Sequence, residues 1–264
     1  MSPTVLVTGA TDGLGKAVAA DLARGGDTVL VHGRDPERLA ATAAEVGAAR
    51  TYRADYAALE EVRALAEAVL EGEERLDVLV NNAGIGTTLP GDGERMESRD
   101  GYELRFAVNY LAPFALTEQI LPLLQRSAPA RIVNVCSAGQ APIDFGDVML
   151  ERRYSATQAY AQSKLAQVMH TLDLAERLDP AQVTANCLHP ATYMPTKIVI
   201  HARGSAVSSL EEGAQATEQL VVDPELAGVS GRYFHGLHES RANGQAYDPD
   251  ARRRLRELSL SLTS

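Results

Sequence analysis

The sequence has no apolar run long enough to cross a membrane. Hydrophobic residues make up 45% of the chain, but no stretch of them approaches the roughly 18 to 20 residues that a spanning helix needs. The first residues, Met1 to Thr4, lead into Val5-Leu6-Val7 without the basic stretch and long apolar segment of a signal peptide. We therefore expect neither a membrane protein nor an exported one, and the predicted location is the cytoplasm.

Cysteine is scarce, since Cys136 and Cys187 are the only two. Each lies in an apolar run, where cysteine behaves as a small buried hydrophobe, so a structural disulfide is not expected. No group of cysteines and histidines has the spacing of a zinc site. His235 and His238 flank Gly236, but two ligands in a polar loop make a weak site. We expect loop surface there and no bound metal.

Positive charge is also limited. The 25 Lys and Arg residues face 35 Asp and Glu, for a formal net charge of −10. This balance argues against a nucleic-acid partner, because such binding rests on clustered positive charge. The net negative charge is compatible only with a local anion-binding site. Lysine is rare within the basic set, with three residues, at 16, 164 and 197, beside 22 arginines.

Short apolar runs alternate with helical patterns along the 264 residues. Strands are predicted at 5–8, 28–32, 50–54, 76–80, 132–136, 183–188 and 231–234, and helices at 14–24, 35–46, 59–70, 99–125, 157–178, 210–221 and 249–258. Pro113 should kink the helix at 99–125. Continuous apolar strands alternating with helices indicate a doubly wound parallel sheet of about seven strands, covered on both faces. No linker or repeat divides residues 1–264, so one α/β domain is predicted.

A glycine-rich turn, Thr8-Gly9-Ala10-Thr11-Asp12-Gly13-Leu14-Gly15, joins the first predicted strand to the first helix. Glycines let the backbone approach a pyrophosphate, and the free amides and the positive end of the helix dipole stabilise its charge. Asn81-Asn82-Ala83-Gly84 follows the fourth predicted strand. Either segment alone could be an ordinary turn.

Together and in register, these two motifs resemble those of the short-chain dehydrogenases/reductases. The resemblance runs through most of the chain and implies a Rossmann-type NAD(P)-binding domain, in which the Asn81 to Gly84 segment stabilises the sheet beside the cofactor. The cofactor-binding residues that it implies in these segments are Gly9, Thr11, Asp12, Gly13, Leu14, Gly15, Asn82, Ala83 and Gly84.

The end of the second predicted strand, His32-Gly33-Arg34, bears on the choice of cofactor. A carboxylate there would bind a ribose 2′-hydroxyl, whereas Arg34 offers planar donors that suit a phosphate and can stack on adenine. We therefore expect NADP(H) in preference to NAD(H). NAD(H) stays possible because Asp12 and Asp35 add negative charge nearby, and Arg34 could instead be a solvated start of the next helix.

Three more cofactor contacts follow from the resemblance. Asp55, after the third predicted strand, matches the residue that faces the adenine amino group, and Tyr56 lies beside it. The alternative for Asp55 is an N-cap of the following helix. Thr192 lies in His189-Pro190-Ala191-Thr192, which stands where the family has Pro-Gly near the nicotinamide amide.

Tyr160 and Lys164 are four residues apart, on one face of the helix predicted at 157–178. A nearby cation favours the charged form of a phenol, so the pair exchanges a proton more readily than tyrosine alone. A tyrosine and a lysine at this spacing often occur by chance on a helix surface and have no catalytic role. The rarity of lysine, and Ser137 at the end of the preceding strand, favour catalysis here.

The resemblance assigns the catalytic roles. Tyr160 is the general acid for carbonyl reduction, or the base for alcohol oxidation, and Lys164 lowers its pKa and binds the nicotinamide ribose. Ser137 hydrogen-bonds the substrate oxygen. Asn109 matches the asparagine that holds a water linking Lys164 to solvent, or else is a polar residue tolerated at a kink. The expected activity is NADP(H)-dependent reduction of a ketone or aldehyde, or oxidation of the alcohol. The alternative is a non-catalytic NADP(H)-binding sensor or scaffold.

An insertion at 143–154 and the segment at 100–109 resemble the retinol dehydrogenase-like members, without the N-terminal anchor of their membrane-bound forms. The stretch at 193–212 is the predicted substrate lid, because long loops in compact domains are often functional. The expected partner is a small carbonyl or alcohol with an apolar body, and neither nucleic acid nor a membrane. Family members commonly pair through the helices that here contain Asn109 and Tyr160, which implies a homodimer or homotetramer.

Overall fold

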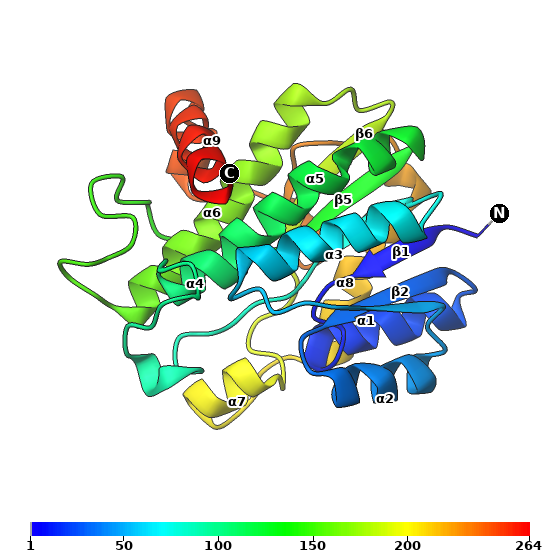
Figure 1. Ribbon diagram of the computed structural model, residues 1–264, viewed down its shortest axis with the longest axis horizontal. Coiled ribbons are helices and arrows are strands. Elements are labelled where there is room, and N and C mark those ends of the chain that lie inside the picture. The colour runs from blue at the N-terminus through cyan, green and yellow to red at the C-terminus, as the bar shows by residue number, and fades with distance from the viewer. Residues whose placement is uncertain (1) are drawn as a thin grey trace.

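The sheet contains eight strands in the order β3-β2-β1-β4-β5-β6-β7-β8 (Figure 1). The computed structural model describes residues 2–264. All neighbouring strands are parallel except β8, which runs antiparallel to β7 at one edge. The strands are β1 (Thr4–Val7), β2 (Thr28–Gly33), β3 (Arg50–Arg53), β4 (Val78–Asn81), β5 (Ala130–Val135), β6 (Val183–His189), β7 (Tyr233–His235) and β8 (His238–Ser240).

Helices cover both faces of this sheet (Figure 1). One face carries α1 (Gly13–Arg24), α2 (Pro36–Val46) and α8 (Leu210–Val222), and the other carries α3 (Leu59–Gly72), α5 (Ala112–Arg126) and α6 (Ala156–Arg177). The remaining elements are α4 (Leu104–Phe106), α7 (Lys197–Arg203), α9 (Pro249–Thr263), the π-helical turn η2 (Ala107–Leu111) and the 3₁₀ turns η1 (Gly91–Gly93), η3 (Pro224–Leu226) and η4 (Gly244–Tyr247). This is the doubly wound Rossmann-type α/β fold expected from the alternating pattern.

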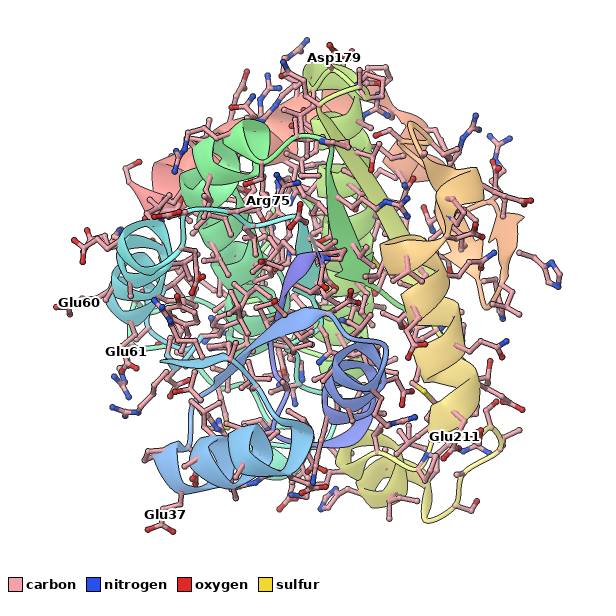
Figure 2. The ribbon with its side chains drawn as sticks, turned by 90° about the vertical axis from the view of Figure 1, so that its right-hand side faces the viewer. Glu37, Glu60, Glu61, Arg75, Asp179 and Glu211 are labelled. Carbon is pink, nitrogen blue, oxygen red and sulfur yellow. The ribbon has the colours of Figure 1, made fainter. Side chains whose placement is uncertain are left out.

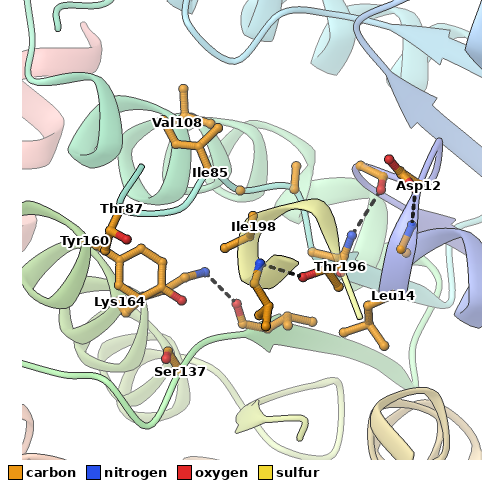
Figure 3. Close-up of a pocket in the computed structure, with 18 of the residues that line it drawn as sticks. Asp12, Leu14, Ile85, Thr87, Val108, Ser137, Tyr160, Lys164, Thr196 and Ile198 are labelled. Atoms are coloured by element: carbon orange, nitrogen blue, oxygen red, sulfur yellow. Dashed lines mark hydrogen bonds between the residues drawn. The ribbon is translucent and has the colours of Figure 1, made fainter. Parts of the chain in front are cut away.

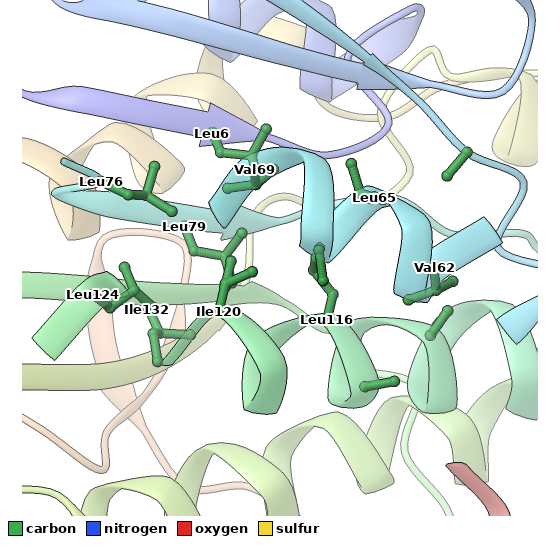
Figure 4. Close-up of a cluster of buried hydrophobic side chains, with 14 of the residues drawn as sticks. Leu6, Val62, Leu65, Val69, Leu76, Leu79, Leu116, Ile120, Leu124 and Ile132 are labelled. Atoms are coloured by element: carbon green, nitrogen blue, oxygen red, sulfur yellow. The ribbon is translucent and has the colours of Figure 1, made fainter. Parts of the chain in front are cut away.

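Aliphatic side chains hold the helices onto the sheet. On one face, α3 and α5 lay a continuous apolar layer over β1, β4 and β5 (Figure 4). Burying one such side chain contributes roughly 1.5–3 kcal/mol, so the layer fixes the strands as a rigid platform. The side chains shown in that layer are Leu6, Val62, Leu65, Val69, Leu76, Leu79, Leu116, Ile120, Leu124 and Ile132.

Charged residues lie on the outer sides of the same helices. Glu37 on α2, Glu60 on α3 and Glu211 on α8 point away from the sheet (Figure 2). All three lie in the first turns of their helices, where a negative charge interacts favourably with the positive end of the helix dipole. No helix within residues 2–264 combines the length and apolarity that crossing a membrane would require.

The chain order reverses between β1 and β4. From β1 the sheet continues through β2 and β3 on one side, and β4 begins the other side. In open α/β sheets a crevice opens at the carboxyl ends of the strands at such a reversal. The glycine turn follows β1 and the segment 82–84 follows β4, so both predicted cofactor motifs meet at that crevice.

The eighth strand was not predicted. His238, Glu239 and Ser240 are exposed and polar, so they show no alternation that would mark a strand. They pair with β7 across the turn at Gly236, where His235 faces His238. These two histidines therefore belong to an edge hairpin rather than to an irregular loop.

The helix predicted at 99–125 starts later and bends differently. It begins at Leu104, because Glu97 and Glu103 pair as an isolated β-bridge before it. The expected kink is a π-helical turn, Ala107–Leu111, directly before Pro113. Proline has no N–H to donate to the carbonyl of Asn109 four residues earlier, and π turns of this kind often lie at functional sites.

The C-terminal helix α9 covers the outer side of α6. Arg256 Nη1 contacts Asp173 Oδ1 of α6 at 2.9 Å, and Ser259 Oγ lies 2.7 Å from the Tyr110 hydroxyl. The helix continues to Thr263, beyond its predicted end at 258. As a result, residues 161–174 of α6 are all buried inside the chain.

Candidate active site

A cavity of about 1000 Å³ lies at the carboxyl ends of the strands (Figure 3). Every predicted site residue lines it except Asn109, which is buried behind it. The structure thus brings together the two ends of the predicted site. The predicted residues that line the cavity are Gly9, Thr11, Asp12, Gly13, Leu14, Gly15, Arg34, Asp55, Tyr56, Asn82, Ala83, Gly84, Ser137, Tyr160, Lys164 and Thr192.

The glycine turn is fixed against the end of β4. Gly9 has a φ of +65°, a left-handed conformation that favours glycine. Asn82 Nδ2 donates to the carbonyl of Thr8 at 2.8 Å. A Cβ on Gly15 would lie 2.5 Å from the Gly9 oxygen, so the turn closes only with glycine there. The turn leaves the N-terminus of α1 facing the cavity, as a pyrophosphate would require.

His32, which was not among the predicted site residues, shapes the end of the cavity near β2 and β3. Its Nδ1 accepts from the Gly9 amide at 3.3 Å, its Nε2 lies 3.1 Å from the Ala54 carbonyl, and its ring stacks on Tyr56 with centroids 4.7 Å apart. Burial lowers the pKa of His32 to about 4, so the ring is neutral and accepts the amide proton. The signal in the sequence that could have indicated a role for His32 was its position as a polar residue within the apolar run 28–32.

Asp55 and Arg34 flank the same end of the cavity. The Asp55 carboxylate accepts from the Ala57 amide at 3.0 Å, while the N-cap of α3 is Ala58, so the N-cap alternative for Asp55 is wrong. Arg34 is exposed and lines the cavity. Within residues 2–264, no carboxylate lies within 4.0 Å of its guanidinium. Its charge is therefore available to an anion.

Ser137, Tyr160 and Lys164 meet at the opposite end (Figure 3). Lys164 is buried, and its ammonium donates to the Val135 carbonyl at 3.1 Å and to Gln167 Oε1 at 2.8 Å. Burial lowers the pKa of Lys164 to about 8. The Ser137 hydroxyl oxygen accepts from the Gly139 amide at 3.0 Å, so its proton is free to be donated into the cavity.

The pKa of Tyr160 differs from the expectation. Burial raises it, and the Ser137 side chain only partly opposes that rise. Lys164, which was expected to lower it, lies 5.9 Å from the centre of the Tyr160 ring. The ammonium is held by Val135 and Gln167 rather than by the phenol, which explains the difference.

Asn109 holds the segment after β4 against α6. Its amide nitrogen donates to Ser163 Oγ at 3.0 Å and to the Ile85 carbonyl at 3.1 Å, and its amide oxygen accepts from the Ile85 amide at 2.8 Å. A Cβ on Gly84 would lie 3.1 Å from that oxygen. The side chain is thus fully bonded and is not merely tolerated at a kink.

An apolar wall, which was not predicted from the sequence, adjoins Tyr160. Its side chains come from the segment after β4, from the start of the α4–α5 helical stretch and from the predicted lid, which contains the helix α7. Their positions follow from tertiary packing and show no period along the chain. The wall comprises Ile85, Pro90, Met96, Leu104, Val108, Ile198 and Val199.

A buried arginine supports this wall from behind. Arg105 Nε donates to the Gly86 carbonyl at 2.9 Å, and its Nη2 donates to the Thr87 carbonyl at 2.7 Å. Its charge faces Glu103, 3.6 Å away, and neither side chain is exposed. Arg105 also donates to the Tyr154 hydroxyl at 2.7 Å, so it ties the insertion at 143–154 to the cavity.

A doubly wound fold with a glycine turn and a tyrosine-lysine pair in one cavity defines a nucleotide-binding oxidoreductase. The family model for short chain dehydrogenases matches residues 3–204. Human retinol dehydrogenase 13 is 38% identical over 277 residues, which cover 96% of this chain and 82% of that protein. The chain belongs to the short-chain dehydrogenase family and resembles the retinol dehydrogenases within it.

Two solved structures with bound dinucleotides share the fold. The NADP active-site complex of Pseudomonas aeruginosa RhlG superposes with a TM-score of 0.71 and 28% identity, over 88% of this chain and 94% of that one. The 3-ketoacyl-(acyl-carrier-protein) reductase of Brucella melitensis, complexed with NADH, gives a TM-score of 0.68 and 25% identity, over 88% of this chain and 96% of that one.

Proposed function

We propose that the protein is an NADP(H)-dependent oxidoreductase that reduces a ketone or aldehyde, or oxidises the corresponding alcohol. The observation that carries this proposal is the shared cavity. Ser137, Tyr160 and Lys164 lie at one end beside an apolar wall, and Arg34 lies at the other end beyond the glycine turn. A dinucleotide lying along the cavity would place its reactive ring beside Tyr160.

The residues present fit a nicotinamide dinucleotide. The glycine turn approaches the end of β4 too closely for a Cβ on Gly9, which would lie 2.7 Å from the Ala83 Cα, and it leaves backbone amides and a helix N-terminus for a pyrophosphate. The family and the NADP and NADH complexes of its structural neighbours support this cofactor class. The preference for NADP(H) rests on Arg34, which suits a 2′-phosphate.

The bound cofactor would supply the hydride, and the protein would supply orientation and the proton. Tyr160 gives its phenolic proton to the carbonyl oxygen in reduction and takes it back in oxidation. Ser137 donates a hydrogen bond to the same oxygen and stabilises the charge that develops there. Lys164 holds the ribose and supplies positive charge near the phenol. The backbone carbonyl of Asn109, in its π turn, is the acceptor we assign to a relay water.

The apolar wall supports a substrate with an apolar body. A small to medium alcohol, ketone or aldehyde would lie against Met96, Val108 and Ile198 with its reacting carbon near Tyr160. The segment at 193–212 is the proposed lid, because α7 within it forms one side of the cavity. The likeness to retinol dehydrogenases agrees with an apolar alcohol.

Tyr160→Phe tests the proton transfer. We expect kcat for reduction of an apolar aldehyde, followed by NADPH absorbance, to fall by about 10²–10⁴-fold, with little change in the dissociation constant of NADPH. Tyr247→Phe is a control that removes a phenol outside the cavity. Turnover unaffected by Tyr160→Phe would refute the mechanism, and cofactor binding without turnover of any carbonyl compound would instead support the sensor alternative.

Arg34→Asp tests the choice of cofactor. We expect the dissociation constant of NADPH to rise by about tenfold or more and that of NADH to change little, because the new carboxylate repels a 2′-phosphate and accepts from a 2′-hydroxyl. Arg126→Asp, at the end of α5 and outside the cavity, is the charge-matched control. Tighter binding of NADH than NADPH by the unaltered protein would refute the preference.

The cytoplasmic location and the homo-oligomer stay predictions. The burial of residues 161–174 of α6 within the chain bears on the second. It leaves residues 161–174 no exposed surface for pairing, so pairing through these helices has to use α5 or the exposed ends of α6.

A further inference from the structure

The carboxylate of Asp12 lies between two cations at the edge of the cavity. Its Oδ1 accepts from the Gly13 amide at 2.8 Å, as the N-cap of α1. Its Oδ2 lies 2.9 Å from Arg38 Nη2 and 2.7 Å from Lys197 Nζ. The three charged residues come from the glycine turn, from α2 and from α7. We call Asp12, Arg38 and Lys197 the rim cluster.

Lys197 brings one end of α7 to the glycine turn. The neighbouring Thr196 methyl lies 3.2 Å from where a Cβ on Gly13 would be. Ile198, the residue after Lys197, packs closely on Gly86, because a Cβ built on Gly86 would lie 2.5 Å from the Ile198 side chain. The helix therefore spans the cavity from the glycine turn to the segment after β4, with Thr196 and Ile198 between Asp12 and Tyr160 (Figure 3).

A permanent negative charge lines the turn that should receive phosphates. Burial favours a higher pKa for Asp12, but hydrogen bonds from Lys197, Gly13 and Arg38 outweigh it and lower the pKa. The carboxylate is thus ionised at neutral pH. An anion at this position repels a phosphate at the N-terminus of α1, so Asp12 opposes cofactor binding unless its charge is compensated.

The two cations differ in how firmly they are held. Arg38 Nη2 also donates to the Thr11 carbonyl at 3.0 Å, so it bridges the turn through two acceptors. Lys197 has Asp12 as its ion-pair partner, and its side chain is 69% exposed. An exposed ion pair of this kind has little net stability, so a phosphate at the turn can replace the carboxylate as the partner of Lys197.

We propose that Lys197 is a phosphate ligand that α7 delivers to the dinucleotide and that Asp12 holds it in the cofactor-free protein. When the cofactor binds, Lys197 moves from Asp12 to the pyrophosphate, and Arg38 stays on Asp12 and compensates its charge. Asp12 is then an internal competitor of the cofactor, not a ligand of it. This inference rests on the proposed dinucleotide-binding function.

The dissociation constants of NADPH and NADH, measured by calorimetry without substrate, test the exchange. Lys197→Gln should weaken both cofactors by about fivefold to tenfold, because the pyrophosphate is common to them. Asp12→Asn should strengthen both by about threefold or more, because the competitor is removed. In the double variant, the gain from Asp12→Asn should be smaller than in the unaltered protein. Lys16→Gln is the control, since the Lys16 ammonium pairs with Glu45 at 2.6 Å and not with Asp12.

Three results would overturn the proposal. They are weaker binding after Asp12→Asn, dissociation constants within twofold of the unaltered protein after Lys197→Gln, and an equal loss after Lys16→Gln. Failure of the unaltered protein to bind either dinucleotide overturns this proposal together with the proposed function. A preference for NADH overturns only the assignment of Arg34, because the Lys197 comparison applies to both cofactors.

Discussion

Lys164 is expected to destabilise the folded protein at neutral pH. Its pKa falls from 10.5 to about 8 because it is buried. Between these two values the unfolded chain holds the proton and the folded chain does not, so stability rises with pH across that window. Below pH 8 the full penalty is present, and the shift corresponds to about 3 kcal/mol. Lys164→Met keeps the length and the apolar stem and removes the charge.

Part of that gain is lost with two hydrogen bonds. The ammonium donates to the Val135 carbonyl and to Gln167 Oε1, at 3.1 and 2.8 Å. Leaving these acceptors without a donor costs about 1 kcal/mol each. The net effect of Lys164→Met at pH 7 is therefore a gain of about 1 kcal/mol, or a melting temperature higher by about 2–4 °C for a chain of this size.

Urea unfolding of both proteins at pH 7, 8, 9 and 10 tests this reasoning. The variant should be the more stable at pH 7 and the less stable at pH 10, because the charge penalty of the unaltered protein disappears while the lost hydrogen bonds remain lost. Lys16→Met, on the surface of α1, controls for the removal of a lysine. A difference that does not change with pH would refute the burial argument. Turnover should fall by at least about 100-fold in Lys164→Met. A variant that is more stable at pH 7 but much less active would separate the catalytic role of Lys164 from its effect on stability.

Two further substitutions test the shape of the cavity. Gly15→Ala places a Cβ 2.5 Å from the Gly9 oxygen, so we expect the dissociation constants of both dinucleotides to rise at least about tenfold, whereas Gly47→Ala, far from the cavity, should leave them unchanged. Arg105→Met leaves Glu103 buried without its cation, so we expect the free energy of unfolding in urea to fall by about 3–5 kcal/mol. The double variant Glu103→Gln, Arg105→Met should recover part of this loss of stability. No recovery would contradict the ion-pair explanation.

The sequence was sufficient to predict the platform and both ends of the site. Buried parallel strands read as continuous apolar runs, and amphipathic helices repeat with a period of 3.6 residues, so the alternation of the two is local information. The glycine turn and the pair Tyr160 and Lys164 are also local patterns, of a turn and of a single helix. The structure places them in one cavity, which follows from the sheet order.

What escaped prediction depends on contacts between distant segments. The apolar wall is built by side chains such as Met96 and Ile198, which come from irregular segments and meet only when α7 crosses the cavity. The burial of residues 161–174 of α6 requires α9, whose apolar stripe of Ala251, Leu255, Leu258 and Leu262 does not itself indicate which element it covers. The pKa of Tyr160 depends on its burial and on where the Lys164 ammonium bonds, and one acceptor of that ammonium is the Val135 carbonyl at the end of β5.

The use of lysine in a chain dominated by arginine follows from what each position has to do. Arginine stays charged at any working pH and holds its partners through a fixed fork of donors, which suits Arg38 on its two acceptors and Arg105 on two carbonyls. A buried ammonium can approach neutrality near pH 8, as Lys164 does, so it can take part in proton exchange. At Lys197 a compact charge on a flexible stem can change partners, which a bidentate guanidinium would resist. Lys164→Arg should therefore fail to restore turnover although it restores the charge, and a fully active Lys164→Arg enzyme would show that charge alone is what the site requires.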